Sequence, residues 1–205
     1  KKRLLSVVVA ALNIGTFIVY DRLGQHGGMS GTTTTAQTTN FVGGGPATPA
    51  LTRYTDGVGV EAWIEIYTQI GTTGTTATIS YTDTTPTAGN TSPAFTIGGT
   101  GYREAQRLLR VPLVSGDRGV TSVENVDLVA STTTAGDFGV TLVKPLVAGL
   151  PLPVAGRGEV YSFIQQVAGG PLDLGTNSDA CIAFAWYPNS TTAPELFGTC
   201  YFMEK

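Results

Sequence analysis

A period-two alternation over residues 58–70 most constrains what this chain can fold into. Nearly every second position from Val58 to Ile70 carries an aliphatic side chain. The positions between them carry Glu61, Trp63, Glu65, Tyr67 and Gln69. Because successive side chains of a strand point to opposite faces, this pattern predicts a half-buried strand and fits the 3.6-residue helical period badly.

The residues that follow predict two further strands joined by tight turns. A turn is indicated at 71–74, where two glycines can take a positive φ. Residues 75–82 are rich in β-branched and aromatic side chains, which favour strands. After a turn at 86–90, residues 92–97 can return as a third strand. We therefore interpret 58–97 as three consecutive antiparallel strands.

Composition supports an all-β chain with few charges. The 205 residues include 27 glycines, and only 13% are charged, against a typical ~25%. Threonine recurs throughout the sequence. We expect a single β domain over 1–205, because one core suffices at this length and no linker composition separates two cores. A surface with few charges is inexpensive to desolvate, which suits lasting contact with neighbours.

The charge balance argues against a nucleic-acid partner, and the hydropathy argues against a membrane. The net charge is −3 and the pI is about 5.1, and the only basic cluster is Lys1-Lys2-Arg3. No run reaches the ~18 apolar residues of a membrane span. The basic end followed by Leu4–Leu12 imitates a signal peptide. We interpret it as an ordered strand or a short helix.

Residues 24–57 differ in composition from the rest of the chain. They are rich in Gly, Thr and Pro and contain few large side chains. We predict an extended arm lying along the domain or along a neighbouring subunit, anchored by Phe41, Val42, Leu51 and Tyr54. The alternative is a long surface loop with one weak edge strand.

The second half of the chain predicts more sheet. Pro112 makes 108–115 an edge strand or a bulged one. Residues 120–130 and 138–143 are expected to pair as a hairpin, and 144–158 to cross between sheets as a loop. Val160, Phe163, Ile164 and Val167 have helical spacing and predict a short helix at 159–168. The fold class is therefore an antiparallel β-sandwich or jelly-roll-like barrel with one short helix.

The last two candidate strands, 180–187 and 195–203, carry both cysteines and many aromatic rings. We expect them to form a hairpin whose rings close one end of the core. That hairpin would place Cys181 and Cys200 on adjacent strands, where a disulfide is geometrically possible. Two cysteines do not make a disulfide scaffold, so buried free thiols are the favoured interpretation.

No stretch of the sequence forms a reaction centre, so we expect no enzyme activity and no cofactor. His26 is the only histidine and has no partner at metal-ligand spacing. Glu61 and Glu65 would lie about 13 Å apart along a strand. Glycosidase carboxylates lie only ~5–9.5 Å apart. Calcium binding through the turn aspartates at 117, 127, 137 and 173 is left open.

Four stretches, at 19–40, 57–82, 111–128 and 133–146, resemble small structural proteins of tailed-bacteriophage virions, the head or decoration proteins. Together they cover about half of the chain. The resemblance implies a β-rich subunit attached to a capsid shell or a tail, with no cofactor and no reaction. It implies no particular site residues.

Two functions follow as hypotheses. The first is a capsid decoration or cement protein in the virion, which binds the major capsid protein or other virion subunits and forms a homo-oligomer. The second is a tail or spike module that recognises host-surface carbohydrate. Its candidate surface aromatics are Trp63 and Tyr67, although both rings could instead pack beneath a second layer of sheet.

Overall fold

The computed structural model describes residues 2–41, 51–85, 89–163, 172–173, 180–189 and 195–204. Throughout this described part the chain forms strands, turns and loops, with no helix, and its paired strands run antiparallel. The longer strands are β1 (Lys2–Ala11), β2 (Gly15–Met29), β4 (Glu61–Thr68), β5 (Thr75–Asp83), β9 (Val120–Leu128), β10 (Asp137–Leu152), β11 (Gly158–Ser162), β13 (Ile182–Pro188) and β14 (Leu196–Glu204). The shorter ones are β3 (Gln37–Thr38), β6 (Asn90–Thr91), β7 (Phe95–Ile97), β8 (Leu108–Arg110) and β12 (Leu172–Asp173). The expected all-β, antiparallel fold is confirmed.

The chain divides into two compact units. Unit 1 comprises Lys1–Asp21 and Pro145–Lys205, and unit 2 comprises Arg22–Lys144. Each unit has its own cluster of buried apolar side chains. The sequence had favoured one domain over 1–205, because no linker composition is visible. The chain passes between the units inside strands β2 and β10, where no linker signal can occur.

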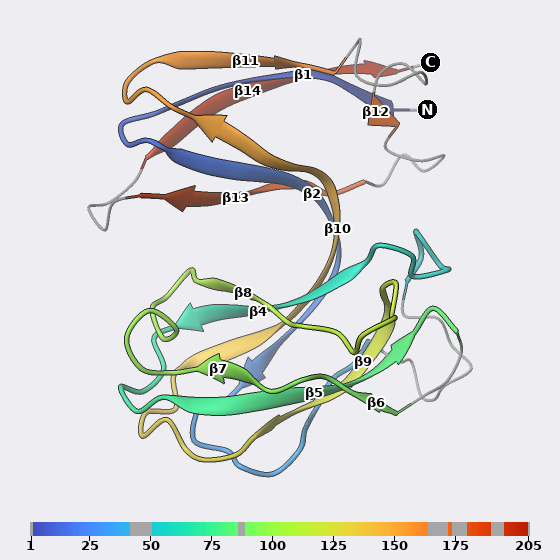
Figure 1. Ribbon diagram of the computed structural model, residues 1–205, viewed down its shortest axis with the longest axis vertical. Coiled ribbons are helices and arrows are strands. Elements are labelled where there is room, and N and C mark those ends of the chain that lie inside the picture. The colour runs from blue at the N-terminus through green and yellow to red at the C-terminus, as the bar shows by residue number, and fades with distance from the viewer. Residues whose placement is uncertain are drawn as a thin grey trace. The chain divides into compact units, whose positions relative to one another are not determined.

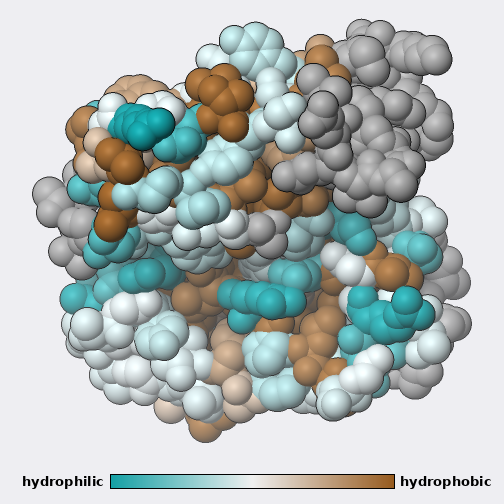
Figure 2. Space-filling view, turned by 45° about the horizontal axis from the view of Figure 1, so that its top comes forward, coloured by the Kyte–Doolittle hydropathy of each residue, from teal (hydrophilic) through white to brown (hydrophobic). Residues whose placement is uncertain are grey.

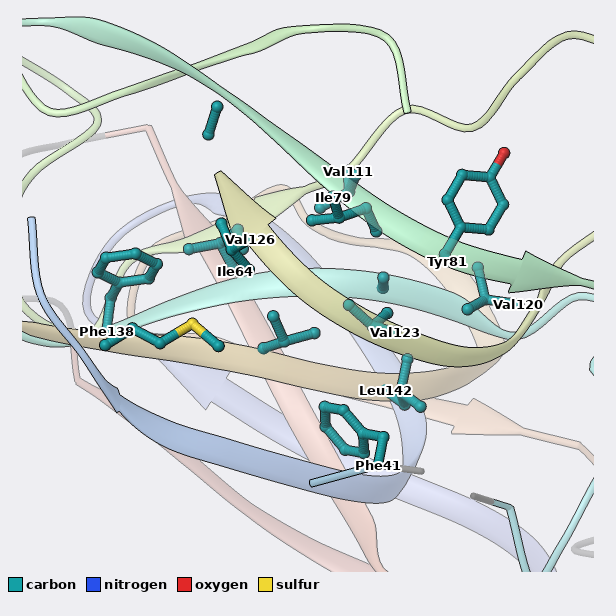
Figure 3. Packing of buried hydrophobic residues seen from close by; sticks show 14 of the residues in the cluster. Phe41, Ile64, Ile79, Tyr81, Val111, Val120, Val123, Val126, Phe138 and Leu142 are labelled. Carbon is teal, nitrogen blue, oxygen red and sulfur yellow. The ribbon is translucent and has the colours of Figure 1, made fainter. Parts of the chain in front are cut away.

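Unit 2 is a β-sandwich. One sheet has the order β2-β10-β4-β8, and the other has the order β3-β9-β5-β6, with β7 also paired to β5. The buried side chains between the sheets come from both inner faces, as Figure 3 shows for Ile64, Phe138 and Leu142 opposite Ile79, Val123 and Val126. The alternation of apolar side chains predicted over 58–70 is confirmed, because Val60, Ala62, Ile64, Ile66 and Ile70 are all buried.

The expected meander over 58–97 is wrong in one connection. β4 pairs with β10 and β8, whereas β5 pairs with β9, β6 and β7, so the turn at 71–74 joins strands of different sheets. Only the return of the third strand onto β5 is confirmed. A tight glycine turn looks the same in sequence whether the next strand pairs back or crosses to the opposite sheet.

Both other predicted hairpins are wrong for the same reason. β9 pairs with β5 and β3, and β10 pairs with β4. β13 pairs with β2, and β14 pairs with β1. The expected loop over 144–158 is also replaced as far as Leu152 by β10, which contains Pro145 and Pro151. The edge prediction holds, since β8 is the outermost strand of its sheet and ends before Pro112.

In unit 1, β1 lies between β11 and β14 and also pairs with β12 (Figure 1). Of the two interpretations for Leu4–Leu12, the strand is the one observed. Its inward side chains Leu4, Val7 and Val9 pack with Phe17 and Val19 of β2. The Phe17 ring also makes an edge contact with Tyr161, with ring centroids 5.5 Å apart. Strand β13 pairs with β2, and these two strands belong to a different sheet from β1.

The short helix expected at 159–168 is wrong where the structure describes it. Residues 158–162 form β11, and Val160 lies opposite Val8 of β1. Val160 is 67% exposed while Phe163 is 1% exposed, so the two do not share a buried helical stripe. Backbone pairing with β1 overrides the local helical spacing. Residues 164–168 lie outside the described part.

Candidate interaction surfaces

The segment predicted as an arm, residues 24–57, is attached to the core of unit 2. Its first six residues complete β2, and β3 is the short edge strand of the alternative interpretation. Phe41 and Leu51 are buried in the unit 2 cluster. Tyr54 packs against that cluster, with the Lys144 ammonium 5.5 Å from its ring centroid. Val42 lies outside the described residues.

The outer face of β4 does not display an aromatic platform. Trp63 is 2% exposed, and its indole N–H donates to a Glu61 carboxylate oxygen at 2.8 Å. Tyr67 is half-buried, and its ring lies close against Gly27 of β2. Burial raises the pKa of the Tyr67 phenol, and the Glu65 carboxylate raises it further. Trp63 is therefore not available to stack on a sugar.

The two glutamates of β4 are each paired with an arginine. Glu61 accepts from Arg110 at 2.6 Å, and Glu65 accepts from Arg22 at 2.5 Å and from the Thr141 hydroxyl at 2.8 Å. These ion pairs connect β4 to Arg22 of β2 and to Arg110 of β8.

The other candidate chemical groups also have structural roles. His26 accepts a hydrogen bond from the Asn40 N–H through Nδ1 at 3.3 Å. Asp137 accepts from the Gly28 N–H at 3.0 Å, and Asp117 accepts from the Tyr81 hydroxyl. Among the described residues, no group of three or more His, Cys, Asp or Glu is placed to hold a metal ion. Nor does any helix there have the length and apolar character to cross a membrane.

Cys181 and Cys200 are free thiols, as expected, but they are not on adjacent strands. Cys181 is exposed next to β13, and its N–H donates to the buried Asp21 carboxylate at 2.8 Å. Cys200 is half-buried in β14, and burial raises the pKa of its thiol. Neither thiol is fully buried.

A groove of about 600 Å³ lies along the loop 111–119 of unit 2. Its charged lining residues are Glu61, Arg110, Asp117 and Arg118. Glu61 and Arg110 pair with each other, and Asp117 holds the Tyr81 hydroxyl. Three of its four charged side chains are therefore already engaged.

Unit 1 exposes an apolar sheet face instead. We call Val8, Val160, Phe197, Thr199 and Tyr201 the apolar face of unit 1. Strand register places them together: Val8 lies opposite both Val160 and Thr199, Ala10 lies opposite Phe197, and Ser6 lies opposite Tyr201. Val160, Phe197 and Tyr201 are 67%, 58% and 53% exposed. Figure 2, which brings the top of Figure 1 forward, shows brown side chains among pale ones over this sheet.

A hollow of about 540 Å³ runs along this face. Its lining includes Val8, Ala10, Phe197, Gly198 and Thr199. Glycine is required at position 198, because a Cβ there would lie 2.6 Å from the Val8 carbonyl oxygen. The sequence had assigned the rings of the last strand to a core. Phe184 and Trp186 do pack against the unit 1 cluster, but Phe197, Tyr201 and Phe202 are exposed.

Comparisons of the chain with protein-family models, with curated proteins and with solved structures found no match. The function must therefore be inferred from the surfaces described above.

Proposed function

We propose that this chain is a structural protein of a bacteriophage virion, a decoration protein that binds the assembled capsid shell and stabilises it. Its partners would be the major capsid protein or other virion subunits. The observation that carries the proposal is the apolar face of unit 1, where Val160, Phe197 and Tyr201 are more than half exposed. The resemblance of the sequence to virion proteins is the second support.

The chemistry of this face suits lasting contact with another protein. From Leu196 to Met203, β14 contains no charged residue. The centres of protein interfaces are depleted in charge and enriched in aromatic residues, because desolvating a charge is costly and burying a ring is favourable. Contiguous exposed apolar patches on soluble proteins commonly mark such sites.

Stabilisation would follow from binding alone. A subunit that binds the assembled shell, but not the separate capsid proteins, shifts the equilibrium toward the shell by mass action. A decoration protein also occupies many equivalent sites on one lattice. Weak contacts made by linked copies then add through their effective concentration. Neither effect needs a catalytic residue or a cofactor.

The carbohydrate-binding alternative loses one of its two candidate residues. Trp63 is buried beneath the outer face of β4, and only Tyr67 retains partial exposure. The proposal of a tail or spike module therefore has less structural support than the decoration protein.

The test is co-sedimentation of the purified chain with undecorated capsids of the phage whose genome encodes it. A variant with Phe197→Ser and Tyr201→Ser should bind at least about tenfold more weakly, because central aromatic contacts often contribute more than about 1 kcal/mol each. Val129→Ser, at a 75% exposed position of unit 2, is the matched control and should bind normally. Equal binding by both variants would refute the assignment of this face. Absence of the chain from intact particles would refute the function.

A further inference from the structure

Strand β14 is an edge strand whose second side is unpaired within the described part of the chain. It is nine residues long and pairs along its other side with β1, from Lys2 to Ala11. An edge of this length presents a row of backbone N–H and C=O groups that can accept another strand.

Among the residues that the structure describes, the other sheet edges are protected. β3, β6, β7 and β8 have only two or three residues. β11 carries Glu159, which pairs with Arg157 at 3.7 Å, and β13 ends at Pro188. Short length, charge and proline are the usual devices that prevent edge-to-edge pairing. β14 has none of them between Leu196 and Met203.

We propose that two copies of this chain pair through their β14 strands, antiparallel and about a two-fold axis at Thr199. Opposite residues in an antiparallel pair lie on the same face. In this register Phe197 of each copy lies opposite Tyr201 of the other on the outer face. Leu196 lies opposite Phe202 on the inner face. The four large apolar side chains at 196, 197, 201 and 202 thus each meet an apolar residue, and such cross-strand aromatic pairs are stabilising.

The charges are compatible with this register. The carboxyl residues Glu195 and Glu204 flank the strand at its two ends. A two-fold axis at Thr199 places Glu195 opposite Met203, so no two like charges face each other. An axis one residue later, at Cys200, would instead place Glu204 opposite Leu196. Self-complementarity of a single strand about a two-fold axis is the requirement for a symmetric dimer, which selects a second copy as the partner.

This pairing does not depend on the proposed capsid binding, since it is measured on the protein alone. It would join two three-stranded arrays, β11-β1-β14, into one continuous sheet. The apolar face of unit 1 would then continue across both copies and double in area.

The first measurement is site-directed cross-linking in a background with Cys181→Ser and Cys200→Ser. In the proposed dimer Thr199 faces its own copy at a cross-strand Cα separation of about 4.5–5.5 Å. This lies within the range of a disulfide. Thr199→Cys should therefore oxidise to a covalent dimer. Phe197→Cys alone should not, because the two copies of residue 197 would lie about 13 Å apart along the strand. A mixture of Phe197→Cys and Tyr201→Cys proteins should form the mixed dimer.

The second measurement is sedimentation velocity of the full chain. We expect a species of twice the 21.3 kDa chain mass, which Thr199→Lys should convert to monomer by placing two like charges opposite each other. Thr76→Lys, at an exposed position of β5, should remain dimeric. A single cooperative thermal unfolding transition would show that Thr199→Lys folds. A monomeric parent protein, a dimer that survives Thr199→Lys, or cross-linking of Phe197→Cys with itself would each overturn the proposal.

Discussion

The side-chain oxygen of Thr132 accepts a hydrogen bond from the backbone N–H of Gly71 at 3.0 Å, and Thr132 is fully buried. The same hydroxyl lies 3.0 Å from the Gly31 carbonyl oxygen and can donate to it. The Thr132 N–H also donates to Gly31, and the Thr132 carbonyl accepts from Thr73. One buried threonine therefore ties together three loops that are far apart in the sequence of unit 2.

Replacing Thr132 with valine tests this tie. The change keeps the shape but leaves the Gly71 N–H without its acceptor, and an unsatisfied buried donor costs about 1–3 kcal/mol. We expect unit 2 to lose that much free energy of unfolding in urea. Thr134→Val is the control, because the Thr134 side chain is exposed, and it should change stability by less than about 0.5 kcal/mol. Equal effects of the two substitutions would contradict the role given to the Thr132 hydroxyl.

Gly71 and Gly74 differ in how much space the structure leaves for a side chain, so their alanine variants test the close packing of the loops. A Cβ at Gly71 would lie 1.5 Å from the Thr132 carbonyl oxygen, whereas a Cβ at Gly74 has its nearest neighbour at 3.8 Å. Gly71→Ala must displace backbone, so we expect a loss of at least about 1–3 kcal/mol. Gly74→Ala should be close to neutral. Thermal unfolding of both variants decides the matter, and a stable Gly71→Ala protein would show that the loops are not packed as described.

Tyr81 gives a prediction about pH. Its side chain is fully buried, its hydroxyl donates to Asp117, and it accepts from the Val114 N–H at 3.0 Å. Burial, followed by the hydrogen bond to Asp117, raises the pKa of Tyr81 to about 12. The folded state therefore retains the phenol proton to a higher pH than the unfolded state, whose tyrosines titrate near 10.

It follows that this contribution to stability is fully present below pH ~10 and is lost as the pH rises from about 10 toward 12. Tyr81→Phe should remove one proton's worth of that pH dependence and cost about 1 kcal/mol at neutral pH. Urea midpoints measured at pH 7 and at intervals between pH 10 and 12 give both numbers. Tyr102→Phe, at a 45% exposed position, should leave the slope unchanged. A slope that persists in Tyr81→Phe would contradict the assignment.

An experiment can decide whether the segment 24–57 is part of the core of unit 2 or an intersubunit arm. Leu51 is 2% exposed in the unit 2 cluster, so Leu51→Ala should cost about 2–5 kcal/mol of stability. Val129→Ala, on the surface of the same unit, should cost almost nothing. A deletion of 30–50 is then expected to destabilise unit 2, because it also removes the buried Phe41. If the deletion variant instead unfolds at the parent temperature and only loses particle binding, the segment is an intersubunit arm.

Local sequence patterns were enough to locate most strands and to show which way several of them face. Alternation at 58–70 identified the buried residues of β4, because a strand that packs on one side needs apolar side chains at period two. Pro112 identified the edge position of β8, because proline removes a ladder donor. The low charge and the lack of clustered ligand residues in the sequence predicted an interaction surface and no reaction centre.

Strand pairing, and the exposure of the aromatic rings of β14, emerged only from the packing of the whole fold. The turns at 71–74 and 130–136, and the connection between β13 and β14, carry ordinary loop residues, and such residues suit a crossing between sheets as well as a hairpin. Nor could the exposure of Phe197 and Tyr201 be predicted from the sequence. Aromatic alternation in β14 looks the same whether a sheet face meets a core or solvent, and that choice depends on strands from elsewhere in the chain. Burial is a property of the packed layers, which local sequence does not encode.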